Sequence, residues 1–268
     1  MNEKEIFDAM LQGFQLLSLM VAGALMVVGS PYGSQTQYQG MLAVDGKLAW
    51  ILMELVSPLA LLSLYAWPLL SIKHFAEYTF SDFLVCLWLV HYVHRAVIYP
   101  LRQPSRKPMH LGIMLSAVAF NMLNGYLNGR WLAQYAPEEL QAKSMEFAWL
   151  HLNQVLWGLL LFVAGMAGNI YHDNILMNIR LCRKTKRGHS IYSVPQGGLF
   201  QVVSCPHFLC EIVEWFGFAV LSGSPAAWTF WLNVVCNLVP RAYFIHKWYQ
   251  ATFADYPQNR KAIVPYLL

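Results

Sequence analysis

Seven apolar stretches take up most of this chain of 268 residues. Each approaches the roughly 20 residues that a helix needs to cross a bilayer, so little chain remains for a soluble domain. We therefore predict an all-α polytopic membrane protein with seven transmembrane helices, built as a single domain over residues 1–268. The stretches run over residues 9–29, 47–70, 81–100, 111–132, 146–170, 199–221 and 226–248.

The composition agrees with this class. Hydrophobic residues make up 57% of the chain and charged residues 12%, against roughly 25% charged in an ordinary soluble domain. The start, MNEKEIFDAM, is acidic and lacks the basic region and small-residue cleavage site of a signal peptide. We expect the first stretch to be a retained span.

Basic residues predict the orientation, because cytoplasmic loops carry an excess of Lys and Arg. Lys4, Lys73, Arg130 and Lys143 fall at one predicted face. The opposite face collects many more, which predicts a cytoplasmic C-terminus and explains the net charge of +4 without nucleic acid. The expected membrane is the endoplasmic reticulum for a eukaryotic chain and the inner membrane for a bacterial one. The residues of the basic face are Arg95, Arg102, Arg106, Lys107, Arg180, Arg183, Lys184, Lys186, Arg187, Arg241, Lys247, Arg260 and Lys261.

The segment RLCRKTKRGHS at 180–190 carries five Lys or Arg residues. It is either a loop that sets the topology or a phosphate clamp, since the arginine fork binds phosphate with bidentate hydrogen bonds. Pro195 and Gly197-Gly198 follow and predict a tight turn of close approach. No GxGxxG follows a strand in the chain, so any dinucleotide is expected to bind without a Rossmann domain.

The segment HYVHRAVIY at 91–99 places Tyr92, Arg95 and Tyr99 on one face of a helix, at i, i+3 and i+7. His91 and His94 share another side. A histidine pair raises the possibility of a di-iron oxygenase, but such enzymes need a much larger ligand set.

Charged residues also interrupt the sixth stretch, HFLCEIVEWFGFAVL. His207, Glu211 and Glu214 have a spacing that suits a metal, yet carboxylate-bridged sites draw ligands from several helices. We predict no metal site. The five cysteines are scattered without a CxxC pair, which indicates neither a zinc site nor a disulfide framework. Acids at bilayer depth tend to face an interior cavity and to mark a functional path.

Other polar residues allow two interpretations each. Glu54 lies alone in the apolar run 48–62, where it makes an interhelical hydrogen bond or, kept neutral by its surroundings, donates a hydrogen bond to an oxyanion. Asn169, Asp173 and Arg180 close the fifth stretch at the expected cytoplasmic mouth, as helix-end caps or as part of a site with the basic loop. Trp50 is a core or lipid-belt residue by default, like Phe120.

The C-terminal stretch YSVPQGGLFQVVSCPHFLCEIVEWFGFAVL and, further on, PRAYFIHKWYQATFADYPQNRKAIVPYLL resembles the steroid 5α-reductases, the 3-oxo-5α-steroid 4-dehydrogenases. The resemblance continues upstream through NIYHDNILMNIR, NGYLNGRW and LVHYVHRAVIY to WILMELVSP, so it covers most of the chain after the first span. It implies a seven-helix membrane enzyme that reduces the Δ4 double bond of 3-oxo steroids with NADPH.

The resemblance also implies site residues. Glu54 and Tyr92 match the catalytic pair that holds the steroid 3-oxo group, and Trp50 and Phe120 fall among substrate-binding positions. His207 stands where the family often has asparagine, and Ile245-His246 where it often has consecutive histidines. Glu211 is expected to accept from the nicotinamide carboxamide, with Glu214 in support. The implied cofactor-binding residues are Arg95, Tyr99, Lys107, Asn169, Asp173, Arg180, Tyr192, His207, Glu211, Trp215, Arg241 and Tyr249, most of them in the part from about 146 to 268.

This resemblance predicts that hydride adds to C5 of the enone while Tyr92 and Glu54 stabilise the enolate oxygen. The expected partners are a steroid or other lipid-like enone and the bilayer, with neither nucleic acid nor an obligate protein partner. Three alternatives stay open: a related reductase of polyprenoids or 2-enoyl thioesters, an isoprenylcysteine-type methyltransferase using S-adenosylmethionine, and a lipid-binding or transport bundle. The lack of internal repeats argues against common transporter designs.

Overall fold

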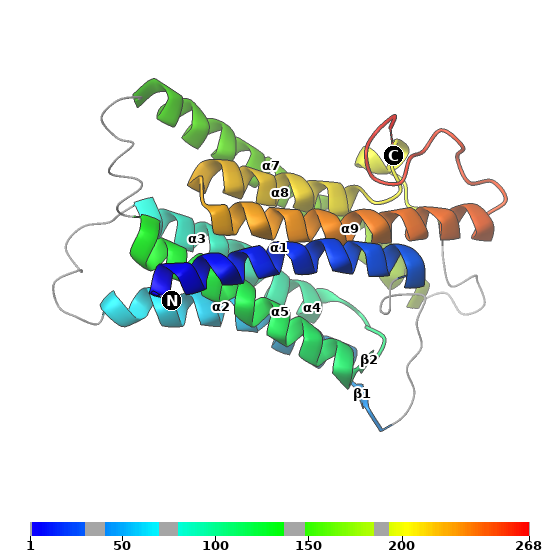
Figure 1. Cartoon of the computed structure of the whole chain (residues 1–268). Coiled ribbons are helices and arrows are strands. Elements are labelled where there is room, and N and C mark those ends of the chain that lie inside the picture. The colour runs from blue at the N-terminus through cyan, green and yellow to red at the C-terminus, as the bar shows by residue number, and fades with distance from the viewer. Residues whose placement is uncertain (1, 30–40, 70–79, 137–147, 185–192, 268) are drawn as a thin grey trace. The chain divides into compact units, whose positions relative to one another are not determined.

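The computed structural model describes residues 2–29, 41–69, 80–136, 148–184 and 193–267. These residues are mainly helical, as Figure 1 shows, and each of the predicted apolar stretches contains a helix. The helices are α1 (Glu3–Val28), α2 (Gly46–Leu69), α3 (Phe80–Tyr92), α4 (Tyr99–Arg102), α5 (Leu111–Arg130), α7 (Ala148–Lys184), α8 (Pro206–Ser222) and α9 (Pro225–Thr252).

Four helices of the described part are long and apolar enough to cross a membrane. An apolar helix suits a bilayer because all of its backbone hydrogen bonds are made within the segment. These four helices support the prediction of a membrane protein. They are Glu3–Val27, Gly46–Tyr65, Phe80–Arg102 and Leu152–Cys182.

The described residues group into two compact units. The first comprises Met1–Leu11, Pro31–Leu156 and Val220–Trp228, and the second Gln12–Ser30, Trp157–Ala219 and Thr229–Leu268. Each unit is therefore described by itself.

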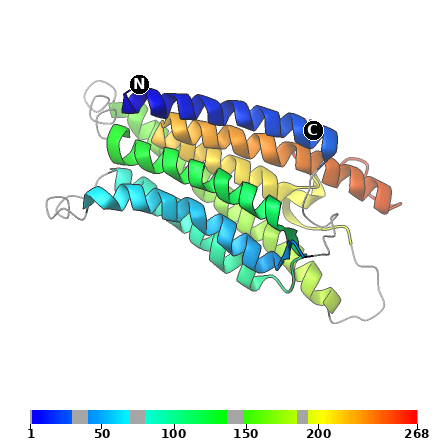
Figure 2. The ribbon, with the colours of Figure 1, turned by 60° about the horizontal axis from the view of Figure 1, so that its bottom comes forward.

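In the first unit, α2 and α5 lie side by side, as the two views in Figures 1 and 2 agree. Two glycines of α5 explain the close packing. A Cβ atom at Gly125 would clash with the Ser57 carbonyl oxygen and lie 2.8 Å from Ala60 Cβ, and one at Gly129 would lie 2.9 Å from Leu61 Cα. Small residues let helix backbones approach closely, so these glycines set the spacing of α2 and α5.

A short antiparallel pair ties the starts of the same two helices together. Strand β1 (Ala43–Val44) pairs with β2 (Met109–His110), with Ala43 opposite His110. In the part of the chain that the structure describes, these are the only strands, apart from one isolated bridge.

The helix that carries the HYVHR segment is not regular. Between α3 and α4, residues Val93–Ile98 form a π-helical turn, so the chain is helical from Phe80 to Arg102 with one wide section. The shared face predicted for Tyr92, Arg95 and Tyr99 assumes an uninterrupted α-helix. Wide turns of this kind are rare and occur frequently at functional sites.

In the second unit, α7 and α8 pack through glycine. A Cβ atom at Gly165 would lie 2.6 Å from Glu214 Cα, and one at Gly217 would lie 2.7 Å from the Gly158 carbonyl oxygen. Aromatic rings fill the adjoining core: Trp215 contacts Phe162, Phe218 and Phe230 at centroid distances of 6.5, 5.7 and 4.5 Å.

Helix α7 differs from its prediction. The polar residues of 168–180 were expected to close the fifth stretch, but the helix continues to Lys184. The interpretation of Asn169 and Asp173 as caps of a helix end is therefore wrong, because both residues lie within the helix and are buried. Buried polar groups are normally hydrogen-bonded, which points to partners on a neighbouring helix.

The sixth stretch also starts differently. Residues 199–205 are not α-helical, and α8 begins at Pro206, a residue favoured at the first helical position. The predicted tight turn before it is confirmed, because Gly197 and Gly198 have φ values of 95° and 52°. Such positive φ values suit glycine.

The C-terminal tail is tied to this segment. Ser204 N donates to the Lys261 carbonyl oxygen at 2.8 Å, and Lys261 N donates to the Val202 carbonyl oxygen at 2.9 Å. The buried Arg260 guanidinium donates from Nη1 to the Pro195 carbonyl oxygen at 3.0 Å and from Nη2 to Gln196 Oε1 at 2.9 Å. The tail thus fixes both ends of the segment 195–205.

Candidate functional site

In the first unit, Tyr92 is the last residue of α3 and has only 3% of its surface exposed. Its ring lies 5.3 Å from the Trp88 ring and 5.1 Å from the His91 ring, measured between centroids. Its hydroxyl accepts a hydrogen bond from Asn124 Nδ2 at 3.5 Å. The ring and the hydroxyl are therefore both held by the surrounding helices.

Glu54 lies on α2 and is partly buried. Trp50 precedes it by four residues and Ser57 follows it by three, so the three side chains share one side of the helix. Ser57 Oγ accepts from the same Asn124 amide that contacts Tyr92, also at 3.5 Å. The structure thus brings Tyr92 together with the helical turn next to Glu54.

Arginine side chains lie around the ring of Trp50, a predicted substrate residue. Its Nε1 donates to the Arg95 carbonyl oxygen at 3.0 Å, and the Arg95 guanidinium carbon lies 5.1 Å from the Trp50 centroid. Tyr99 completes the group, with Arg95 5.0 Å from its ring centroid. The structure therefore joins one predicted substrate residue with two predicted cofactor residues.

Arg106 belongs to this group but was predicted only as a topology-setting charge. Its guanidinium carbon lies 3.6 Å from the Trp50 ring centroid, closer than that of Arg95. Cation–π contacts of this kind stabilise by roughly 0.5–2 kcal/mol. No spacing in the sequence indicates the contact, because it joins a loop to the start of α2.

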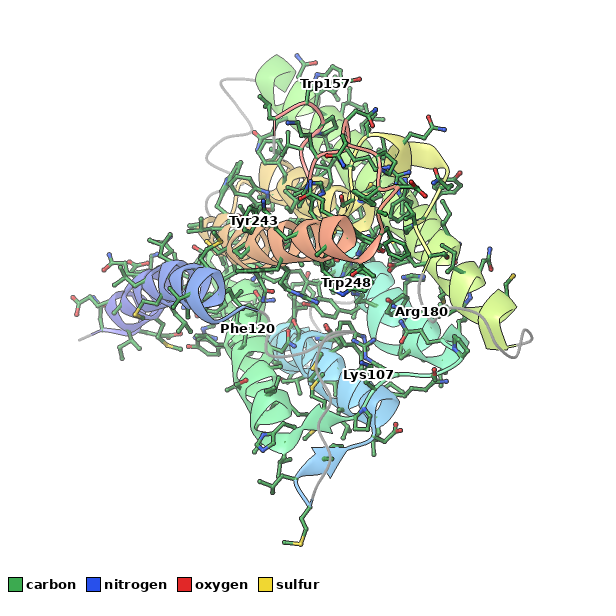
Figure 3. The ribbon with its side chains drawn as sticks, turned by 90° about the vertical axis from the view of Figure 1, so that its right-hand side faces the viewer. Lys107, Phe120, Trp157, Arg180, Tyr243 and Trp248 are labelled. Carbon is green, nitrogen blue, oxygen red and sulfur yellow. The ribbon has the colours of Figure 1, made fainter. Side chains whose placement is uncertain are left out.

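Two further predicted residues of this unit are labelled in Figure 3. Phe120 lies on α5 and is partly buried, whereas Lys107 is exposed on the segment between α4 and β2. Beside Phe120, Asn121 Nδ2 donates to the Met53 carbonyl oxygen at 2.8 Å.

In the second unit, Asn169 of α7 reaches α8. Its Nδ2 donates to the His207 carbonyl oxygen at 2.9 Å and to Glu211 Oε2 at 3.4 Å. Asp173, one turn further along α7, is buried with 2% of its surface exposed. The structure places Asn169, His207 and Glu211 next to one another, three residues to which the resemblance gave a cofactor role.

The two carboxylates of α8 differ in their surroundings. Glu214 is buried with 1% of its surface exposed, whereas Glu211 is partly buried. Trp215 follows Glu214 and belongs to the aromatic core of the unit. Gly165 of α7 makes room for the α8 backbone at Glu214.

The remaining predicted cofactor residues lie on α7 and α9. Arg180 is exposed in the C-terminal part of α7 (Figure 3), and the Arg241 guanidinium carbon lies 5.1 Å from the Phe208 ring centroid. Tyr249 stacks on Tyr256 with 5.4 Å between centroids and 10° between ring planes. Tyr192 lies outside the described residues, as does most of the basic loop.

The sequence did not single out His172. Its Nδ1 donates to the Gly168 carbonyl oxygen at 2.6 Å, and its Nε2 accepts from Leu199 N at 3.1 Å. One nitrogen donates and the other accepts, so the ring is neutral with its proton on Nδ1. A Cβ atom at Gly198 would lie 2.8 Å from His172 Nε2. His172 therefore holds the turn at Gly197-Gly198 against α7.

The polar groups of the second unit fit the chemistry of a nicotinamide dinucleotide. Asn169, Asp173 and Glu211 supply amide and carboxylate groups for a carboxamide or for ribose hydroxyls, and Arg180 and Arg241 suit phosphate. Asn174 Oδ1 is buried without a hydrogen-bond partner in the described residues, which leaves an acceptor on the same helix. Within those residues, no three His, Cys, Asp or Glu side chains group closely enough to hold a metal ion.

Comparison with known proteins adds a further finding. Residues 107–268 match the sequence model of a protein family described as 3-oxo-5-alpha-steroid 4-dehydrogenase. The chain is 35% identical to steroid 5-alpha-reductase DET2 of Gossypium hirsutum over 271 residues, covering 99% of both chains. It is also 35% identical to 3-oxo-5-alpha-steroid 4-dehydrogenase 1 of Mus musculus over 274 residues, covering 100% of this chain and 99% of the mouse protein.

Proposed function

This chain belongs to the 3-oxo-5-alpha-steroid 4-dehydrogenase family, and on that premise we propose that it reduces the Δ4 double bond of 3-oxo steroids with NADPH, giving 5α-steroids. The observation that carries the proposal is the similarity to named steroid 5-alpha-reductases along nearly the whole chain. A match of this extent includes every helix that bears a predicted site residue.

Tyr92 and Glu54 act on the 3-oxo group of the steroid. Tyr92 donates a hydrogen bond to the carbonyl oxygen, and Glu54, in its neutral form, donates a second. Negative charge develops on that oxygen during the reduction, so these donors bind the transition state more strongly than the substrate. A preorganised donor in a dry site commonly contributes about 10²–10³-fold in rate. The burial of Tyr92 supports such a site.

Trp50 and Phe120 line the place of the steroid in this proposal. Both are aromatic and at least partly buried, and an apolar fused-ring substrate favours such surfaces.

The polar residues of α7, α8 and α9 hold the cofactor. NADPH, when bound, supplies a hydride to C5 of the enone, and a proton added at C4 completes the reduction. Glu211 accepts from the carboxamide of the nicotinamide, and Asn169 orients Glu211 through the hydrogen bond between them. Arg180 and Arg241 bind phosphates, and Asp173 accepts from a hydroxyl group.

We place the enzyme in a membrane with seven crossings and a cytoplasmic C-terminus. The four helices long and apolar enough to span support this arrangement, and α5, α8 and α9 complete the set. The membrane is the endoplasmic reticulum in a eukaryote and the inner membrane in a bacterium. The steroid reaches its site through the bilayer.

One assay tests the proposal. Membranes containing the protein are incubated with a Δ4-3-oxo steroid together with NADPH, NADH or labelled S-adenosylmethionine. The expected result is a 5α-reduced steroid formed with NADPH. Transfer of the labelled methyl group would support the methyltransferase alternative, and no conversion of the steroid with either nucleotide would refute the proposal.

A further inference from the structure

We infer that Asn124 of α5 is a positioning residue for the reduction, because its amide holds the Tyr92 hydroxyl in the orientation that donates to the substrate oxygen. The inference rests on the proposed function, since it assigns a partner to the tyrosine that acts there. Asn124 is fully buried, with 0% of its surface exposed.

Asn124 belongs to a row of buried amides. Asn121, Asn124 and Asn128 follow one another at i, i+3 and i+7 on α5, and all three are buried. Polar side chains in membrane segments are rare and usually face the bundle interior. The row lies on the side of α5 that faces α2, since Asn121 donates to the Met53 carbonyl oxygen and Asn124 contacts Ser57.

The network determines which way the Asn124 amide points. The side-chain amide of Asn128 lies 3.1 Å from the main-chain carbonyl oxygen of Asn124. Because that oxygen can only accept, the Asn128 atom that faces it is the donor Nδ2. The same Nδ2 lies 3.1 Å from the side-chain amide of Asn124, which must therefore present its oxygen. The remaining amide atom of Asn124 is Nδ2, and it faces Ser57 Oγ and Tyr92 OH.

This orientation has a consequence for Tyr92. A phenol hydroxyl has one hydrogen to donate and accepts through its oxygen. Because Asn124 Nδ2 can only donate, Tyr92 must use its oxygen toward Asn124, and its hydrogen is directed to a different acceptor. Hydrogen bonds in a chain polarise one another, so the bond from Asn124 also strengthens the donor of Tyr92.

The distances suit a site that tightens with substrate. Both bonds from Asn124 measure 3.5 Å, at the long end for hydrogen bonds. Catalytic hydrogen bonds are often long without substrate and shorten in the reacting complex. The Tyr92 ring is held by Trp88 and His91, and Gly125 allows α5 to approach α2 at Ser57. Small movements of these side chains are therefore enough to shorten the two hydrogen bonds from Asn124.

The test is a double-mutant cycle with a matched control. Asn124→Leu removes the amide while keeping most of the volume, and Asn121→Leu does the same one turn away, at a buried asparagine that bonds to Met53 instead of Tyr92. Each change is made in the unmutated enzyme and in Tyr92→Phe. Steroid kcat, steroid KM and NADPH affinity are measured for all six proteins.

We expect Asn124→Leu to lower kcat about tenfold, as the loss of one hydrogen bond predicts, with steroid KM and NADPH affinity within about twofold. In the Tyr92→Phe background the same change should lower kcat by less than about twofold, because the hydroxyl on which Asn124 acts is gone. Asn121→Leu should have the same effect in both backgrounds.

Equal losses from Asn124→Leu in the two backgrounds would overturn the inference and leave Asn124 a structural residue. If Tyr92→Phe reduces steroid as fast as the unmutated enzyme, the assigned role of Tyr92 fails and the inference fails with it. If Asn124→Leu does not fold, Asn124→Ala takes its place, since it removes the amide without adding bulk and must show the same dependence on Tyr92.

Discussion

The Asn169 amide of α7 donates to the Glu211 carboxylate of α8 across 3.4 Å. This bond joins two residues that lie 42 positions apart in the chain and both carry a proposed cofactor role. It gives Glu211 a fixed orientation, which a carboxylate needs if it is to accept from one particular group of a bound nucleotide.

Glu211 is expected to act on the nicotinamide and not on a metal. Glu211→Gln should weaken NADPH binding roughly tenfold, because an amide accepts less strongly than a carboxylate. A strong chelator should leave steroid reduction unchanged. Stoichiometric iron or zinc in active purified protein would contradict this assignment, as would full NADPH affinity in Glu211→Gln.

Arg180 is expected to favour NADPH over NADH through the additional phosphate. Arg180→Ala should raise KM for NADPH about tenfold or more, since charge-assisted hydrogen bonds are the strong ones, and should change steroid binding little. Arg102→Ala is the control, because Arg102 is another exposed arginine near a helix end. Equal use of both nucleotides by the unmutated enzyme would disprove the role.

Tyr92 and Glu54 are expected to act as one unit. Tyr92→Phe and Glu54→Gln should each lower kcat by about 10²-fold or more, whereas NADPH affinity should barely change. The double variant should be little slower than the slower single variant, because losses from cooperating groups are strongly non-additive. Normal turnover by a folded, NADPH-binding Glu54→Gln would show that Glu54 has only a structural role, as part of an interhelical hydrogen bond.

Gly125 is expected to be necessary for stability. Gly125→Ala places a methyl group against the Ser57 carbonyl and 2.8 Å from Ala60 Cβ, and overpacking costs roughly 1–3 kcal/mol. Gly23→Ala is the matched control, since nothing lies within 4 Å of its added Cβ. Thermal unfolding in detergent should show a lower midpoint for Gly125→Ala alone; equal midpoints would argue against tight packing of α2 and α5.

Arg260 is expected to stabilise the segment before α8. Arg260→Lys keeps the charge but loses the two-pronged bond to Pro195 and Gln196, because lysine has no planar fork. Losing one such bond costs about 1.5–3 kcal/mol. Proteolysis between residues 193 and 205 measures the effect, and a rate equal to that of the unmutated protein would show that the tail does not hold this segment.

The helices were predictable because each apolar stretch has a length and composition that few other structures accept. Their ends were less so. Asn169 and Asp173 were interpreted as the polar end of a helix, yet both are buried within α7. The partners of Asn169 lie on α8, and no local pattern indicates a contact across 38 or 42 positions. Likewise, residues 199–205 were predicted as the start of the sixth helix but are not part of α8. Ser204 instead pairs with Lys261, which lies 57 positions later.

The sequence names candidate site residues, but it does not indicate which of them contact one another. The family pattern pointed to Tyr92 and Glu54, whereas Asn124 and Arg106 enter only through tertiary packing. One signal for Asn124 was present: three asparagines at i, i+3 and i+7 in an otherwise apolar helix. Polar residues repeated on one face of such a helix indicate a buried polar network.

The π-helical turn at Val93–Ile98 means that the helix from Phe80 to Arg102 holds its residues in a register that an ordinary helix lacks. A wide turn of this kind holds one residue more than the α-helical winding that it replaces, so the residues that follow it keep nearly the direction that a regular helix one residue shorter would give them. Deleting one residue from this turn should therefore restore regular winding and leave Tyr99 beside Trp50. Inserting one residue would instead rotate Tyr99 and Arg102 about the axis by about 100°, the rotation of one α-helical residue, so in this helix a gain of length is more harmful than a loss.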